Sequence, residues 1–198
     1  IRGTTHRDVK GWIDSIDHMK TFNAEYLFPS HTKPIVGKNE INDVLTIYRD
    51  AIQYIHDYAV RGANIGKTPD ELVEEFEYPP FFLENYDLQE KYGKVSWSIR
   101  NVYNGYLGFF DGRAVNLEPL SDKKRSKHIF ELIGSKEKLI EEINKANGAL
   151  NYQWAAELCD VGLFNFPEDK EIKKLYSRSL ENLSKIEKNP IARNYYLS

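Results

Sequence analysis

The side chains best suited to chemistry in this sequence are its five histidines, His6, His18, His31, His56 and His128. No two of them have the short spacing, H-x-H or H-x-x-x-H, that places two imidazoles on one metal ion. A catalytic zinc ion takes three protein ligands and a water molecule, so these histidines cannot form a zinc site locally. Any histidine that binds metal here must share it with residues that are distant or absent. We interpret His18, His56 and His128 as structural or solvated.

His31 is the best single candidate for a metal ligand. It follows the short apolar run Tyr26-Leu27-Phe28, which predicts a strand, and it lies in a polar loop that contains Pro29 and Pro34. Loops that follow a strand often carry binding residues, because a rigid scaffold positions them. From this pattern alone, an ordinary loop histidine is the more frequent outcome.

Arg2 and Arg7 flank the start of a predicted helix, with His6 between them. Guanidinium groups offer a rigid fork of donors, and the first backbone N–H groups of a helix carry partial positive charge. This combination suits a tetrahedral oxyanion such as sulfate or phosphate. The competing interpretation, which the residues alone slightly favour, pairs Arg7 with Asp8 or a later carboxylate and leaves Arg2 in solvent.

Tyr103 and Asn104 lie in an aromatic run, residues 102–112, where rings alternate with small residues. A hydroxyl and an amide beside a glycine could contact a ligand oxyanion from a neighbouring domain, although core packing is the default for such rings. Gly105 costs about 1 kcal/mol relative to alanine if the helix continues through it. We therefore expect a close backbone approach or a kink at this position.

Helical periodicity dominates the elements that must position these residues. Asp8 precedes a predicted helix that reaches Met19, and Thr68 begins a capping box with Pro at the first helical position and Glu71 at the third. The remaining predicted helices are 41–59, 96–110, 121–133, 135–147, 152–164 and 167–186. Residues 149–186 resemble a tetratricopeptide helix pair, and one such pair must pack against other helices to be stable.

The bulk composition limits the classes of partner. The net charge is -3, so no overall field attracts nucleic acid or an anionic membrane, and no apolar stretch has the length of a membrane span. Cys159 lies among apolar helical positions and is interpreted as a buried hydrophobic side chain. The cellular compartment is not indicated. Because the sequence begins at Ile1 and not at Met, we take it to be a fragment or a processed product.

Six ordered segments together resemble the alkylsulfatases of the metallo-β-lactamase superfamily, enzymes that cleave sulfate esters such as dodecyl sulfate. Each segment is short, and their shared order makes the resemblance specific. The segments are Arg2-Gly3-Thr4 with Arg7-Asp8, Ser30-His31-Thr32 with Pro34 and Gly37, residues 48–57, residues 68–72, residues 103–112 and residues 192–197.

The resemblance implies a binuclear zinc centre in which His31 is one ligand. The histidine-rich H-x-H-x-D-H motif and the bridging carboxylates would then lie in an N-terminal part outside this chain. It also implies that Arg2, Arg7, Tyr103 and Asn104 bind the sulfate group of an alkyl sulfate substrate, and that His6 is a candidate proton donor to the leaving group.

The implied fold is mainly α. Residues 1–37 would be a helix-strand piece of the metallo-β-lactamase-like catalytic domain, and residues 38–198 a helical dimerisation domain with tetratricopeptide-like hairpins. The expected partners are a second copy, forming a homodimer, and the N-terminal remainder of the polypeptide. The apolar faces of 41–59 and 139–183 are candidate dimer surfaces, with an internal core as the competing explanation. The alternative function is a non-catalytic helical interaction module.

Overall fold

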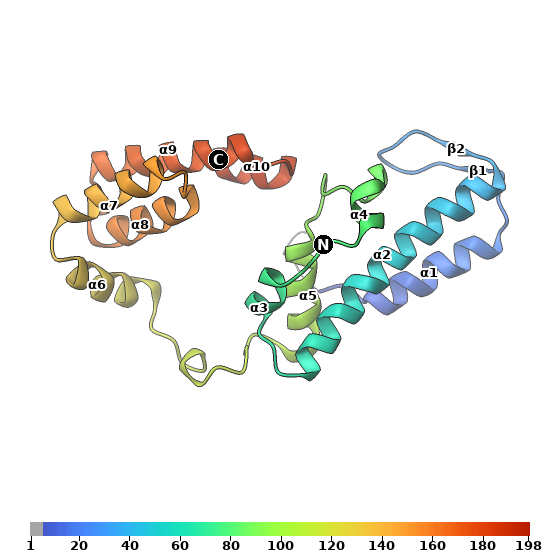
Figure 1. Cartoon of the computed structure of the whole chain (residues 1–198), viewed down its shortest axis with the longest axis horizontal. Helices are drawn as coiled ribbons and strands as arrows, with labels where there is room; N and C mark the ends of the chain where they lie inside the picture. The colour runs from blue at the N-terminus through green and yellow to red at the C-terminus, as the bar shows by residue number, and fades with distance from the viewer. Residues whose placement is uncertain (1–5) are drawn as a thin grey trace. The chain divides into compact units, whose positions relative to one another are not determined.

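A computed structural model describes residues 6–198 of the chain (Figure 1). It separates into two compact units, one ending at Ala114 and the other running from Val115 to Ser198. Within the described residues the only sheet has two strands, and helices make up most of the rest. The predicted mainly α fold is therefore confirmed. The domain boundary predicted after residue 37 is a different boundary from the division after Ala114, and it stays a prediction.

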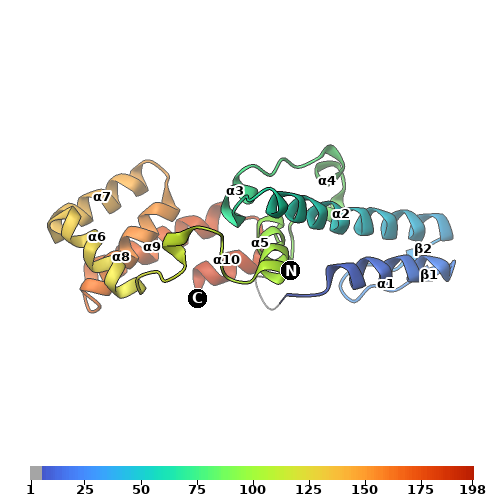
Figure 2. The same ribbon diagram turned by 90° about the horizontal axis from the view of Figure 1, so that it is seen from below.

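The first unit is built around two long helices, α1 and α2, which lie side by side in both Figure 1 and Figure 2. Asp8, predicted to lie at the start of this helix, is its cap: its carboxylate accepts a hydrogen bond from the Gly11 N–H at 3.0 Å. The elements of this unit are α1 (Val9–Thr21), β1 (Tyr26–Leu27), β2 (Ile35–Val36), α2 (Lys38–Asn64), α3 (Pro69–Glu74), α4 (Pro80–Glu84), the 3-10 turn η1 (Tyr86–Leu88) and α5 (Val95–Leu107).

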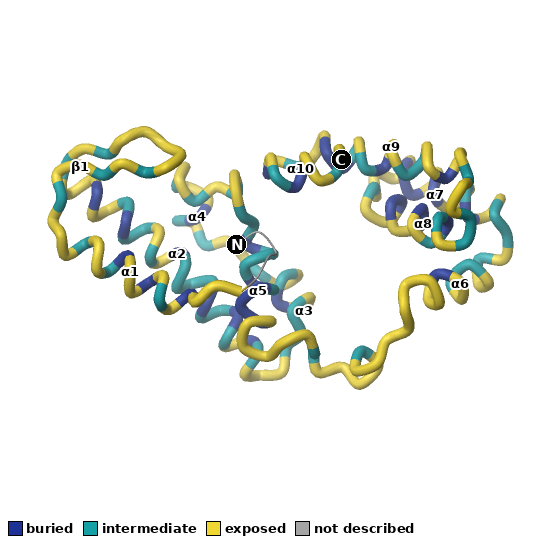
Figure 3. Tube along the Cα trace, turned by 180° about the vertical axis from the view of Figure 1, so that it is seen from behind, coloured by how far each residue is buried: buried dark blue, intermediate teal, exposed yellow. Residues whose placement is uncertain are grey.

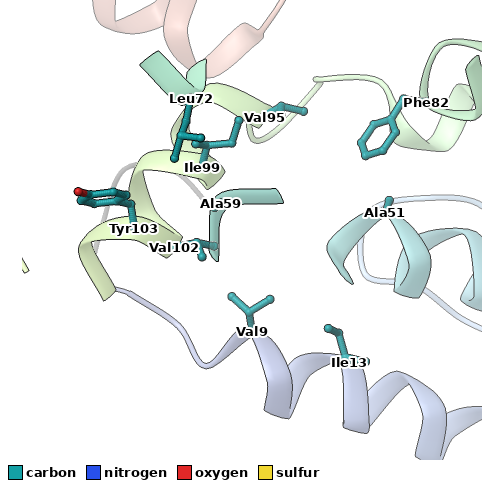
Figure 4. Packing of buried hydrophobic residues seen from close by; sticks show 10 residues of the cluster. All are labelled: Val9, Ile13, Ala51, Ala59, Leu72, Phe82, Val95, Ile99, Val102 and Tyr103. Atoms are coloured by element: carbon teal, nitrogen blue, oxygen red, sulfur yellow. The ribbon is translucent and has the colours of Figure 1, made fainter. Parts of the chain in front are cut away.

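The core of the first unit lies where α1, α2, α3, α4 and α5 meet (Figure 4). Ile99 and Ala59 are fully buried there, and Leu72 is 1% exposed. Helix α3 comes close to α2 at Gly62, where an added Cβ would lie 2.1 Å from a Leu72 methyl carbon. Only glycine allows this approach, so the chain can place α3, and with it α5, directly on α2.

The segment after α1 is a small antiparallel hairpin in which Tyr26 pairs with Val36 and Leu27 with Ile35. The first strand was predicted, whereas β2 was assigned to the loop because two residues are too few to show an alternating pattern. Gly37 ends the hairpin with φ 109°, a conformation that favours glycine, and it is the N-cap residue of α2. The hairpin thus fixes both ends of the loop that carries His31.

The capping box at α3 is present as predicted, with Thr68 and Glu71 exchanging hydrogen bonds. Helix α5 ends earlier than the predicted 110, because Gly108 has φ 76° and its N–H bonds to the Asn104 carbonyl.

The second unit is a bundle whose buried residues face one another between α7, α8 and α9 (Figure 3). Gly162 of α8 allows close approach, since a Cβ there would lie 3.0 Å from Ile172 and 3.1 Å from Leu139. The expectation that the tetratricopeptide-like pair packs on preceding helices is met by contacts of α8 with α6 and α7. The 3-10 turn η2 (Ala114–Asn116) spans the division between the units, and the bundle itself consists of α6 (Asp122–Ile133), α7 (Lys136–Gly148), α8 (Tyr152–Asn165), α9 (Lys170–Ile186) and α10 (Pro190–Leu197).

The apolar stripes that we considered as dimer surfaces are used inside the two units. Ile41 and Leu45 are 5% and 8% exposed, and Leu139 and Ile143 are fully buried. The competing explanation, an internal core, is therefore the one that the structure supports at these positions. No helix among the described residues is both long and apolar enough to cross a membrane.

Candidate functional site

His6 is exposed and lies directly against the last turn of α5. Its Nδ1 is 3.1 Å from the Asn101 carbonyl oxygen, and its ring meets the Tyr106 ring edge-on with centroids 6.2 Å apart. Because a carbonyl oxygen only accepts hydrogen bonds, Nδ1 must carry the proton in this contact. The neutral ring then has its lone pair on Nε2, which is the atom left to exchange a proton.

Gly105 makes this position of His6 possible. A Cβ added at residue 105 would lie 2.0 Å from His6 Nδ1 and 2.3 Å from its Cε1, far inside contact distance. The close approach predicted at this glycine is confirmed. The imidazole therefore packs directly against the backbone at residue 105, a position that the Cβ of any other residue would occupy.

His56 supports the same region from α2. It is 5% exposed, and its Nε2 lies 2.9 Å from the Tyr106 hydroxyl oxygen, while its Nδ1 lies 2.9 Å from an Asp57 carboxylate oxygen. Burial opposes ionisation of Asp57, but hydrogen bonds from His56 and Gln53 outweigh it and lower the pKa of this carboxyl. The interpretation of His56 as structural is consistent with its burial, and its hydrogen bonds connect it to α5.

A polar chain continues from Asp57 along α2 to α1. Gln53 donates to the second Asp57 oxygen at 3.3 Å and accepts from Arg49, whose Nε is 3.2 Å from the Asp17 carboxylate. The hydrogen bonds to Asp50 and Asp17 raise the pKa of Arg49, although its burial opposes this. This chain of contacts fixes α1 on α2, and His6 directly precedes α1.

Arg7 lines a surface hollow of about 300 Å³ at the start of α1, together with Asp8, Gly11, Trp12 and Ser15. The Asp8 carboxylate is engaged by the helix N–H at Gly11, as expected of a capping residue. An anion in this hollow would meet the guanidinium and the positive end of the helix. The other predicted arginine, Arg2, lies outside the described residues.

Tyr103 and Asn104 occupy different environments on α5. Tyr103 is 5% exposed and belongs to the core, and Figure 4 shows its hydroxyl pointing away from the other labelled side chains. Burial, and then the charges of Asp111 and Glu71, raise the pKa of this phenol, so it keeps its proton and can donate a hydrogen bond. Asn104 is exposed at the helix surface.

His31 is exposed in the loop between β1 and β2, where its ring stacks on Tyr92 with centroids 6.0 Å apart and planes at 23°. The imidazole is thus exposed, and the Tyr92 ring orients it. No cluster of three or more His, Cys, Asp or Glu side chains suited to a metal ion occurs within residues 6–198.

His6 and Arg7 are neighbours in the sequence just before α1, and the structure places His6 against the turn of α5 that contains Asn104 and Gly105. His31 contacts Tyr92, and the residues that line the Arg7 hollow do not include it. Sequence reasoning missed Tyr106 and the pairing of His56 with it. The only available signal was Gly105, which predicted a close approach of another group to this turn of the helix or a kink.

The comparisons with known proteins are consistent along the whole chain. The alkyl sulfatase dimerisation family matches residues 68–198. The chain is 38% identical to a linear primary-alkylsulfatase of a Pseudomonas species, over 100% of this chain and 38% of that protein. It is 28% identical to an (R)-specific secondary-alkylsulfatase of Pseudomonas, over 100% of this chain and 30% of that protein.

The same likeness is seen in three dimensions. The solved structure of a stereoselective inverting sec-alkylsulfatase from Pseudomonas matches with a TM-score of 0.92 and 28% sequence identity. The match covers 98% of this chain and 31% of that one. The chain thus spans 30% to 38% of the length of the relatives that it matches.

Proposed function

Because this chain belongs to the alkyl sulfatase dimerisation family, we propose that it is one part of a zinc-dependent hydrolase that cleaves alkyl sulfates to an alcohol and sulfate. The observation that carries the proposal is the extent of the similarity. It covers the whole chain, including the residues before 68 that hold His6, Arg7 and His31. The remainder of the enzyme would be supplied by an N-terminal part of the same polypeptide.

In this proposal the start of α1 and the end of α5 form one wall of the sulfate-ester site. Arg7 and Arg2 bind the sulfate oxygens, where guanidinium donors stabilise the charge that grows as the ester bond breaks. Tyr103, whose raised pKa keeps it protonated, and Asn104 add hydrogen-bond donors. The Nε2 of His6 first takes up a proton from solvent and then gives it to the oxygen atom that departs, which returns the ring to its neutral Nδ1–H form and leaves the charges balanced.

The proposed metal ligand in this chain is His31. Its exposed imidazole fits the role. Zinc, when bound, would supply a Lewis acid and an activated water molecule. The stacking partner Tyr92 would fix the plane of the His31 ring, as partners around metal ligands commonly do.

The test uses the full-length polypeptide that contains this chain. Zinc content is measured by atomic emission, and hydrolysis of dodecyl sulfate is followed by sulfate release. We expect His31→Ala to lower bound zinc by about one equivalent per chain, because a lost ligand opens one metal position. His128→Ala is the matched control, since His128 is exposed and bonded to Glu131 on α6. A metal-free and inactive wild-type protein would refute the proposal and leave the helical interaction module.

We also propose that the chain forms a homodimer, in keeping with the name of its family. The predicted apolar stripes are covered within each unit, so the interface must use other side chains. Exposed apolar residues in the matched region provide them, since such side chains often mark contact surfaces when they gather in a patch. Those of the second unit include Leu132, Leu150, Trp154, Phe164, Ile186, Tyr195 and Leu197.

A further inference from the structure

Beneath His6 lie two side chains, Tyr106 and His56, to which the proposed reaction gives no role. His56 is an ionisable group that is 5% exposed, and burial of such a group is costly unless both ring nitrogens have partners. Both do: Nδ1 lies 2.9 Å from Asp57 and Nε2 lies 2.9 Å from the Tyr106 hydroxyl. A buried pair of this kind needs an explanation beyond core packing.

The directions of these hydrogen bonds follow from the chemistry of the partners. An ionised Asp57 carboxylate can only accept, so His56 Nδ1 carries the proton and donates it. The neutral ring then has an acceptor at Nε2, and the Tyr106 hydroxyl donates to it. The result is a chain of hydrogen bonds from Tyr106 on α5 through His56 to Asp57 on α2, in which the Tyr106 hydroxyl has one fixed orientation.

The Tyr106 ring lies between the two histidines. Its centroid is 5.7 Å from that of His56 and 6.2 Å from that of His6, with interplanar angles of 67° and 61°. Tyr106 is 53% exposed, so it is not a core residue that needs its hydroxyl satisfied by a buried group. Fixing the hydroxyl on His56 therefore fixes the ring edge against which His6 packs.

We propose that Tyr106 is a positioning residue for His6, and that the Asp57–His56 pair holds Tyr106 in place. The inference rests on the proposed function, in which His6 donates the proton. The Asn101 carbonyl sets which nitrogen of His6 is protonated, and Gly105 leaves room for the ring. Tyr106 restricts the remaining freedom, rotation of the imidazole away from α5. Side-chain orientation of this kind is what keeps a proton donor in line with its acceptor.

A double-mutant cycle in the full-length, zinc-loaded polypeptide tests this proposal, with dodecyl sulfate as the probe. Tyr106→Phe keeps the ring and removes the hydroxyl, and we expect kcat to fall about tenfold with KM unchanged, the effect of one hydrogen bond. In a His6→Gln background the same substitution should have no further effect. A residue that acted on stability or touched the substrate directly would lower kcat by the same factor in both backgrounds, which would overturn the proposal.

Two more variants change His56, which accepts the hydrogen bond of the Tyr106 hydroxyl. His56→Leu removes the acceptor and should reproduce Tyr106→Phe, whereas His56→Gln keeps an acceptor oxygen near the position of Nε2 and should retain more of the activity. Tyr26→Phe is the matched control, because Tyr26 is 59% exposed and its ring also stacks on a neighbouring ring, that of Phe28. Its kcat should equal that of the wild type.

Imidazole nitrogen NMR of this chain gives a reading that does not depend on activity. We expect the Nδ1–H form of His6 to predominate in the wild type and to lose population in Tyr106→Phe. An unchanged tautomer in that variant would overturn the positioning role while leaving the proposed reaction intact. A His6→Gln enzyme with full activity would instead remove the role of His6, and with it both proposals for this residue.

Discussion

Replacement of Gly105 by alanine is the sharpest available perturbation of the proposed site. The new Cβ would lie 2.0 Å from His6 Nδ1, 2.3 Å from Cε1 and 2.4 Å from Cγ, so the imidazole must leave its place on α5. The nearest atoms all belong to one side chain in the segment before α1. The ring can therefore swing outward without disturbing the backbone of the helix.

The expected effect on stability is small. Alanine in place of glycine favours a helix by about 1 kcal/mol. Displacement of His6 breaks its hydrogen bond to the Asn101 carbonyl, a loss of about 0.5–1.5 kcal/mol. These two changes oppose each other, so the free energy of unfolding measured in urea should stay within about 0.5 kcal/mol of the wild-type value.

The expected effect on catalysis is large. A positioned general acid contributes about 100-fold to 10,000-fold to rate, so kcat for dodecyl sulfate should fall by at least about 100-fold. Gly148→Ala is the matched control: Gly148 is also helical, and a Cβ there meets nothing within 4 Å. If Gly105→Ala retained activity within about twofold, the assignment of His6 as proton donor on this turn would be refuted.

Three further predictions concern the two units. Gly62→Ala should destabilise the chain by about 1–3 kcal/mol in urea unfolding, because its Cβ would overlap the buried Leu72 side chain; unchanged stability would contradict this packing. Burial, with a smaller effect of the Asp160 charge, raises the pKa of the Cys159 thiol to about 12. The folded chain thus holds this proton more tightly than the unfolded one, so the stabilisation is complete below pH ~8.5 and is lost as the pH rises towards 12. Consistently, a disulfide reagent at pH ~8.5 should modify Cys159 readily only in urea. Light scattering should give a mass of about 46 kDa, twice the 23.1 kDa of one chain, and a mass near 23 kDa would argue against the dimer.

Local signals in the sequence predicted much of the fold. The start of α1 at Asp8, the capping box at Thr68 and the helical periods all depend on neighbours within a few residues, and each appears in the structure. The strand β2 was missed because two residues carry no periodicity. The end of α5 was placed too late, because the left-handed turn at Gly108 leaves no apolar signature.

The candidate site was less accessible from the sequence, because its contacts join residues far apart in the chain. His56 and Tyr106 are 50 positions apart, and His6 and Asn101 are 95 apart, so no motif could have paired them. Gly105 was the exception, since an unfavourable residue within a helix indicates a contact that compensates for it. The apolar stripes considered for dimerisation lie in the core. A periodic apolar pattern predicts that a helix face is buried, but it does not say whether the same chain or a second chain covers that face.

Sulfate binding measured at individual histidines tests the central claim most directly, namely that the start of α1 and the end of α5 form one wall of the sulfate-ester site. Sulfate, the product, is titrated into the full-length zinc-loaded polypeptide while imidazole resonances are followed by NMR. We predict that the His6 resonances shift with the same midpoint as inhibition of hydrolysis, and that those of His128, on α6, do not move. His6 resonances that stay fixed at inhibitory sulfate concentrations would contradict the account.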